Sequence, residues 1–177
     1  MAENDRIILN QILEQQRQEI GSDLDEGEYF EIFSSEQILK NYELTYDEIE
    51  SGIVDGGNDG GIDSLYIFVN GNLLEEDYSL DIYKRDISIA LVIIQSKTSN
   101  GFSEQILTQI LHTIADVFDL TKPIDSLQQK YNNQLLSIIH RFREVYEKLA
   151  SKFPKLEIKY YYTSKADEIH PNVTNLS

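Results

Sequence analysis

The chain has 177 residues, of which 41% are hydrophobic and 26% are charged, as in ordinary single-domain globular proteins. It contains no cysteine, which excludes disulfides and thiolate metal sites and fits a reducing cytosol. No segment approaches the roughly 18 uninterrupted apolar residues of a membrane span, and the first residues lack the basic and apolar regions of a signal peptide. We therefore expect a cytoplasmic protein with no membrane partner.

Negative charge is concentrated in the first half of the sequence. The net charge is −16, and residues 1–90 contain 5 basic and 22 acidic side chains, whereas residues 91–177 contain 10 and 9. Such a charge argues against indiscriminate binding of nucleic acid. An acidic region that binds a phosphate needs a cation, as in a Mg²⁺-dependent enzyme. The alternative interpretation is a solvated surface that promotes solubility.

Three helices are predicted before the first strand. Apolar residues at helical spacing predict an amphipathic helix over residues 5–20, which the segment 23–27 interrupts. A second helix is predicted near residues 28–41. Thr45 and Glu48 have the spacing of a capping box, which predicts a short third helix.

The middle of the chain predicts a loop, a hairpin and a buried strand. Four glycines within residues 55–61 permit positive φ angles and close backbone approach. Residues 62–69 predict a strand, and Asn70-Gly71 predicts a two-residue hairpin turn to a weaker strand near 72–74. Residues 87–97 are nearly all apolar, as in a central strand that is buried on both faces.

Two long helices are predicted near residues 103–120 and 125–152, followed by a final strand over 156–163. The order of these elements predicts a mixed α/β fold with helices packed on a sheet. Residues 170–177 end without a terminating element, so we expect this chain to be the front of a longer protein.

Three polar residues stand at the ends of predicted strands. Asp63 shares the apolar face of its strand, where a buried carboxylate is costly unless it binds a cation. Gln95 and Lys97 are two residues apart and share a face of the later strand. Because the hairpin at Asn70-Gly71 turns the chain back toward the following strands, we expect the three side chains to lie close together.

In that arrangement the Asp63 carboxylate and the Gln95 side-chain oxygen would bind a hard divalent cation, helped by the backbone carbonyl of Ser96. Oxygen ligands favour Mg²⁺ or Mn²⁺, either of which polarises a phosphate and lowers the pKa of a water. Lys97 would orient that water and neutralise charge on the phosphate oxygens. These residues predict a site that hydrolyses phosphodiester bonds.

Other acids are further candidates for the same site. A carboxylate of the second predicted helix, Glu31 first and Glu36 second, would complete the metal ligands directly or through water. Asp59 is either a second acid near the metal or a turn former between glycines, and we favour the turn.

The motifs resemble those of the PD-(D/E)XK nuclease superfamily in its Mrr-like form, which has Phe-Glu, Gly-x-Asp and Gln-x-Lys. The matching residues here are Phe30-Glu31, Asp63 and Gln95-Ser96-Lys97. The longer stretches 59–67 and 94–97 are similar to the N-terminal domain of AIPR-type proteins, which are bacterial abortive-infection proteins of phage resistance.

The resemblance implies a restriction-endonuclease-like α-β-β-β-α-β core over residues 28–165. A helical extension, 1–27, precedes this core, and residues 166–177 would begin a linker to a missing C-terminal region. The resemblance also implies Mg²⁺-dependent endonuclease cleavage of DNA in antiviral defence. Gln95 replaces the acid of the basic superfamily pattern, and a neutral ligand holds a metal less tightly.

Two other functions fit the same residues. One is a nuclease fold retained for binding or oligomerisation without catalysis, which the acidic first half and Gln95 favour. The other is cleavage of RNA, because metal-assisted hydrolysis does not select a particular sugar. A homodimer is a further possibility, through pairing of the two long helices.

Several features also have plain structural explanations. Asp63, Gln95 and Lys97 fit ordinary strand ends, and sheet packing explains Tyr160-Tyr161-Tyr162 better than base stacking does. The three histidines lack metal-ligand spacing and are expected to be packing or surface residues: His112, His140 and His170. Several basic residues of the rear half form a helix face that either contacts a nucleic-acid backbone or is solvated, and we favour the solvated face: Arg141, Arg143, Lys148, Lys152 and Lys155.

Overall fold

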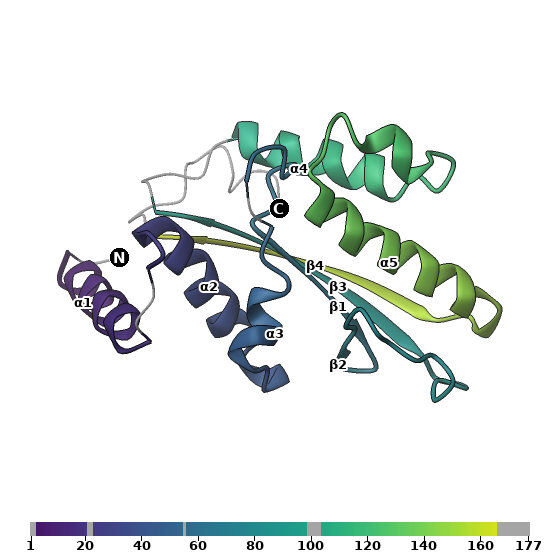
Figure 1. Cartoon of the computed structure of the whole chain (residues 1–177), viewed down its shortest axis with the longest axis horizontal. Helices are drawn as coiled ribbons and strands as arrows, with labels where there is room; N and C mark the ends of the chain where they lie inside the picture. The colour runs from purple at the N-terminus through teal and green to yellow at the C-terminus, as the bar shows by residue number, and fades with distance from the viewer. Residues whose placement is uncertain (1–2, 21–22, 55, 99–103, 166–177) are drawn as a thin grey trace.

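A four-stranded mixed β-sheet forms the centre of the protein, and helices cover both of its faces (Figure 1). The computed structural model describes residues 3–20, 23–54, 56–98 and 104–165, so the predicted linker lies outside the described residues. In chain order, the strands are β1 (Ser64–Val69), β2 (Asn72–Leu73), β3 (Ser88–Lys97) and β4 (Lys155–Ser164). Their order across the sheet is β2-β1-β3-β4, with β1 antiparallel to β2 and β3, and β3 parallel to β4. The predicted α/β class is confirmed.

Strand β3 is the buried central strand that its apolar sequence predicted. All residues from 91 to 96 are buried, because β1 and β4 pair with its edges and helices cover its faces. The hairpin turn is also confirmed. Asn70 and Gly71 have φ angles of 51° and 84°, the left-handed conformation of both central residues in a type I′ turn. The Asn70 side chain accepts the Ser88 N–H at 2.7 Å and so fixes the start of β3.

The two faces of the sheet bury different helices. Side chains alternate along a strand, so Leu65 and Ile67 of β1 pack in the cluster that contains the apolar face of α5. Tyr66 and Phe68 point the other way and pack with residues of α2 and α3. The helices are α1 (Glu3–Glu19), α2 (Glu26–Leu39), α3 (Tyr46–Glu50), α4 (Glu104–Val117) and α5 (Asn133–Leu149). Short 3-10 helices are η1 (Lys40–Tyr42), η2 (Ile124–Leu127) and η3 (Ala150–Lys152).

Helix α5 begins later than its apolar periodicity predicted. We expected one helix over 125–152, but η2 and a turn come first, and the Asn132 side chain accepts the Leu135 N–H at 2.9 Å. An asparagine in this position is a favourable N-cap, and it starts α5 at Asn133. Leu127 is nevertheless buried in the same core as α5, and this extended the apparent period beyond the true helix.

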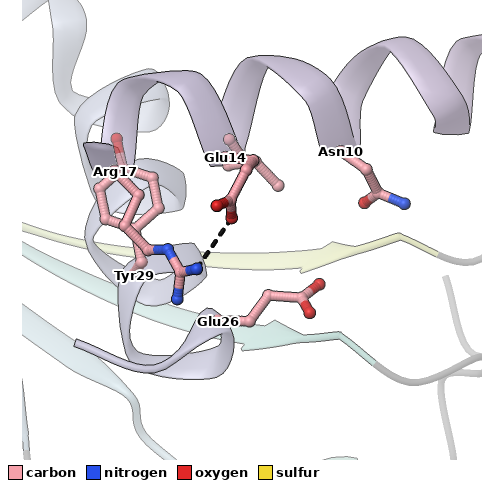
Figure 2. A pocket seen from close by; sticks show the side chains of 6 residues that line it. Asn10, Glu14, Arg17, Glu26 and Tyr29 are labelled. Atoms are coloured by element: carbon pink, nitrogen blue, oxygen red, sulfur yellow. Dashed lines mark hydrogen bonds and ion pairs between the residues drawn. The ribbon is translucent and has the colours of Figure 1, made fainter. Parts of the chain in front are cut away.

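Helix α1 packs against α2 at the edge of the fold and not on the sheet (Figure 1). Leu13 of α1 is buried with Tyr29 and Phe30 of α2. Figure 2 shows the polar side of this contact, where Arg17 pairs with Glu14 at 2.8 Å above the start of α2. None of the described helices is long and apolar enough to cross a membrane.

Helix α2 starts two residues earlier than predicted because of a capping box. The Asp25 side chain accepts the Glu28 N–H at 2.9 Å, and the Glu28 carboxylate accepts the Asp25 N–H at 2.8 Å. We treated residues 23–27 as a helix breaker, whereas Asp25 is the N-cap of the next helix.

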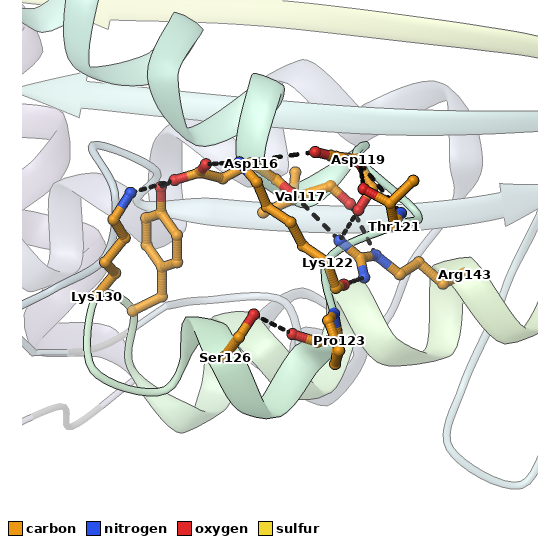
Figure 3. A network of polar contacts seen from close by, with 10 residues as sticks. Asp116, Val117, Asp119, Thr121, Lys122, Pro123, Ser126, Lys130 and Arg143 are labelled. Atoms are coloured by element: carbon orange, nitrogen blue, oxygen red, sulfur yellow. Dashed lines mark hydrogen bonds and ion pairs between the residues drawn. The ribbon is translucent and has the colours of Figure 1, made fainter.

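A buried arginine fixes the end of α4, contrary to its predicted place on a solvated face (Figure 3). Arg143 is 7% exposed, and its guanidinium donates to the carbonyls of Asp116, Val117, Asp119 and Lys122 at 2.6–3.2 Å. The last carbonyls of a helix have no partner within the helix, so this side chain of α5 supplies one. The guanidinium therefore joins α5 to the end of α4 and to the loop that follows it.

The carboxylate of Asp116 organises the same region from the other side. Its two oxygens accept from Lys122 and Lys130, both at 2.7 Å, and from the Tyr131 hydroxyl at 2.9 Å. These hydrogen bonds, led by that of Lys122, hold the pKa of Asp116 well below its usual range. The Asp116 carboxylate thereby joins α4 to the segment between η2 and α5.

Acid should weaken the fold through Asp116. A carboxyl group whose pKa is lowered by folding stabilises the protein above its unfolded pKa of about 3.9. That stabilisation is lost as the pH falls from there toward the lower folded value. We expect Asp116→Asn to cost about 1 kcal/mol at pH 7 and less at pH 2.5, where part of the stabilisation has been lost, measured by urea unfolding. Equal losses at both pH values would contradict this assignment, and the exposed residue Asp81 provides the control Asp81→Asn.

Candidate active site

The structure brings together the residues that the motifs singled out on β1 and β3. The Asp63 carboxylate is buried at 5% exposure, and its Oδ1 lies 3.7 Å from the ammonium nitrogen of Lys97. Its Oδ2 accepts the backbone N–H of Ser96 at 2.6 Å and the Ser96 hydroxyl at 3.3 Å. The Asp63 N–H donates to the Ile94 carbonyl, just before the first β1–β3 pair of Ser64 with Ile94, so Asp63 lies beside the end of β3 that carries Gln95 and Ser96. The predicted proximity of Asp63 and Lys97 is therefore observed.

Gln95 lies on the same face as Asp63, and Tyr160 of β4 holds its side chain. Gln95 is 2% exposed, and its Oε1 accepts the Tyr160 hydroxyl at 3.2 Å. In the parallel β3–β4 register Gln95 is paired with Tyr162, so two β4 tyrosines lie on the site's side of the sheet. Burial raises the pKa of Tyr160 well above its usual range, which keeps its hydroxyl protonated as a donor.

Electrostatics at Asp63 are dominated by burial. Removal from water raises the pKa of Asp63, while the Ser96 N–H and the charge of Lys97 oppose the shift, and the charge of Asp59 adds to it. Lys97 is less buried, with 35% of its side chain exposed. The pair therefore consists of a partly solvated lysine at the rim and a buried carboxylate beneath it. Further positive charge close to this carboxylate would stabilise its ionised form.

The glycine loop positions Asp63 by packing against α4. Gly60 and Gly61 have φ angles of 68° and 81°, which favour glycine. A Cβ on Gly60 would lie 2.6 Å from the Thr113 hydroxyl, which donates to the Gly60 carbonyl at 2.7 Å. Asp59 accepts the Gly61 N–H at 2.6 Å, so it forms the turn that we favoured.

The carboxylates predicted from α2 lie in the other layer. Helix α2 packs with the face of β1 and β3 that is opposite to the Asp63 side chain. Glu31 lines a pocket that it shares with Leu24, Glu28, Ile32, Glu50, Ile53 and Gln134. Glu36, the second choice, is partly buried, and that burial raises its pKa. A metal-ligand role for Glu31 or Glu36 therefore remains a prediction, as does that of the Ser96 carbonyl.

Sequence reasoning missed Tyr160 and Thr113 as supports of the site. Tyr160 was assigned to sheet packing, and it does pack against the core as well as bonding to Gln95. Its position is set by the parallel pairing of β3 with β4, which are separated by about sixty residues of sequence. Thr113 carries no signal of its own because its contact depends on how α4 packs on the glycine loop.

The donor atoms suit a small hard cation with water in its remaining positions. The available groups are a carboxylate, a side-chain amide and a backbone carbonyl, all of them oxygen donors, and Mg²⁺ commonly uses one or two carboxylates and keeps several waters. Within the described residues no group of three or more histidine, cysteine or acidic side chains is arranged to hold a metal. These oxygen donors are of the kind that Mg²⁺ and Mn²⁺ use.

Both described histidines, His112 and His140, are exposed as expected, and His170 lies outside the described residues.

Comparison with protein-family models, characterised proteins and solved structures finds no match to this chain.

Proposed function

We propose that this chain is a metal-dependent nuclease domain with the restriction-endonuclease-like architecture of PD-(D/E)XK enzymes, cleaving DNA in antiviral defence. The observation that supports this most is the buried Asp63 carboxylate, which lies 3.7 Å from Lys97 and accepts the N–H of Ser96, the residue between Gln95 and Lys97. The order α2, β1, β2, β3, α4–α5, β4 is compatible with the α-β-β-β-α-β order that the resemblance implies.

Each residue of the site has a distinct part in this proposal. Asp63 and Gln95 hold the cation, and the Ser96 N–H keeps the Asp63 carboxylate in one orientation. Tyr160 orients the Gln95 amide through its oxygen. Lys97, whose side chain is partly exposed, neutralises charge on the phosphate. Bound Mg²⁺ supplies polarisation of the phosphate and a more acidic water.

The same contacts also support a second candidate, a nuclease fold without catalysis. Asp63 and Lys97 already neutralise each other, and the Gln95 oxygen already accepts a hydrogen bond. Because these polar groups already have partners within the chain, their role can be purely structural, holding the ends of β1 and β3 together. DNA is the proposed substrate, and RNA remains an alternative.

Calorimetric titration with Mn²⁺ separates the two candidates. The nuclease proposal expects heat of binding in the wild type that disappears in Asp63→Asn. Cation at 100 times its Kd should stabilise the wild type by about 2.7 kcal/mol, which raises Tm by roughly 5–10 °C for a chain of this length. Asp63→Asn should show no such rise.

Protons compete with the cation for Asp63. Because burial raises the pKa of Asp63, cation affinity should fall as the pH decreases through that raised value. Wild-type protein that binds no divalent cation at pH 8 would support the non-catalytic candidate. Digestion of DNA and RNA side by side identifies the substrate.

A further inference from the structure

Strand β4 presents an unpaired edge within the part of the chain that the structure describes. It ends the strand order, and it runs beside β3 for ten residue pairs without a bulge. The backbone N–H of Lys155 donates to the carbonyl of Ile87, the residue before β3, and the backbone N–H of Lys165 donates to the carbonyl of Lys97 at the end of β3. Odd-numbered residues therefore face β3, and backbone groups alternate along a strand. Leu156, Ile158 and Tyr160 consequently direct their N–H and C=O groups outward.

Large apolar side chains are unusually exposed along this edge. Leu156 is 36% exposed, Ile158 44%, Tyr161 40%, and Phe153, just before the strand, 91%. Leu156 and Ile158 belong to the face of the sheet that α5 covers elsewhere, since they pair with Ile89 and Leu91 of the main core. Edge strands of natural proteins are usually protected by bulges or by inward-pointing charges. The α5-side face of β4 carries neither over residues 156–160.

Charge on the opposite face of β4 alternates in sign. Lys155, Glu157 and Lys159 follow one another on that face, and Lys159 lies 3.4 Å from Glu157 within the chain. An antiparallel copy of the same strand reverses this order, so the pattern can complement itself. The apolar and the charged face of the edge both fit a second copy of this chain.

We propose that two copies pair through antiparallel β4 edges about a two-fold axis at Ile158, forming one continuous eight-stranded sheet. Ile158 lies opposite Ile158 of the other copy, and Leu156 lies opposite Tyr160. These are hydrogen-bonded pairs, as the outward direction of their backbone groups requires. Glu157 of each copy then lies opposite Lys159 of the other copy. These two symmetric pairs occupy the closely spaced non-hydrogen-bonded positions.

Charge selects this register from its neighbours. A two-fold axis at Glu157 or at Lys159 would use the same outward backbone groups. The first places Glu157 opposite Glu157 and the second Lys159 opposite Lys159, and like charges that face each other are destabilising. An axis at Leu156 sets Pro154, which has no N–H, opposite Ile158. An axis at Tyr160 leaves Glu157 and Lys159 without opposite charges. The proposal is independent of nuclease activity, and it places the two Asp63 sites toward opposite ends of the joined sheet.

A charge-swap series tests the proposal by sedimentation equilibrium. The wild type should show a dimer of twice the 20.4 kDa chain mass. Glu157→Lys and Lys159→Glu should each weaken association at least about tenfold. The double variant should restore it, and an equimolar mixture of the two single variants should form a mixed dimer. Circular dichroism confirms that each variant is folded. A monomeric wild type at 100 µM, or a dimer indifferent to all the swaps, overturns the proposal.

The absence of cysteine allows a second, direct test. Cα atoms of a hydrogen-bonded antiparallel pair are about 5.5 Å apart, within the range for a disulfide. Ile158→Cys should therefore crosslink rapidly under mild oxidation. Tyr161→Cys is the matched control, because the two Tyr161 residues would be separated by about six residues, or roughly 20 Å, along the strands. Equal crosslinking of both variants, or of neither, contradicts the register.

Discussion

Replacing Asp63 by asparagine is expected to reduce Mg²⁺-dependent cleavage of DNA on the order of 10³-fold while leaving the fold at least as stable. The expected loss follows because asparagine removes the buried carboxylate at the end of β3 that would hold the cation. The gain in stability follows from the sign of the pKa shift. Burial raises the pKa of Asp63, so its ionised form is disfavoured by the folded state at neutral pH. Asparagine relieves that cost, as is common for substitutions at functional sites.

Lys97→Met should reduce cleavage by a similar order, about 10²–10³-fold, because it removes the cation at the rim of the site. Both variants are measured by single-turnover cleavage of plasmid DNA alongside thermal unfolding. Matched controls come from the exposed loop between β2 and β3, where Asp81→Asn and Lys84→Met change the same charges away from the site. Cleavage that survives in either site variant would falsify the site assignment. A lower Tm in Asp63→Asn would show that the ion pair is structural.

Arg143→Ala is expected to cost about 3–4 kcal/mol of unfolding free energy, the largest stability effect that we predict. The guanidinium makes hydrogen bonds to four carbonyls from an almost fully buried position. Its removal leaves carbonyl groups without partners and opens space between α4 and α5. Arg143→Lys should recover only part of this, because an ammonium group cannot match the planar fork of a guanidinium.

Arg141→Ala is the matched control for this prediction. Arg141 is two residues away on the same helix; its guanidinium donates to one carbonyl, that of Leu74 at 3.1 Å, and lies 3.4 Å from the 88% exposed carboxylate of Glu76. One carbonyl hydrogen bond and an ion pair with an exposed partner together contribute about 1–2 kcal/mol, less than the four carbonyl bonds of Arg143. Urea unfolding monitored by circular dichroism measures both variants. If the two arginine variants lose equal stability, the guanidinium does not fasten the end of α4.

The strands of this fold were predictable because their signals are local. Residues 87–97 are apolar throughout and become the central strand, and Asn70-Gly71 forms the turn that its backbone preferences require. These two features bring Asp63 to the end of β3, where its carboxylate lies 3.7 Å from Lys97, so the proximity of this pair followed from sequence. Thr45 likewise starts α3 through the predicted capping box.

Features that depend on packing between distant segments were not predictable. A charged side chain such as Arg143 has the pattern of a solvated helix face, and only the end of α4 beside it makes burial favourable. Tyr160 contacts Gln95 because β4 is parallel to β3, which no short pattern states. For Glu31, helical spacing predicted a carboxylate on α2, but it did not predict the face of the sheet on which α2 packs.

One contact described above makes the end of β3 a sensor of the site. Main-chain pairing of β1 with β3 begins at Ser64, and the Asp63 side chain extends it by accepting the next N–H, that of Ser96. Any ligand that draws the carboxylate away frees that amide proton to exchange with solvent. Deuterium uptake at the Ser96 amide should therefore report whether a ligand occupies the site, even in a variant or condition that shows no turnover.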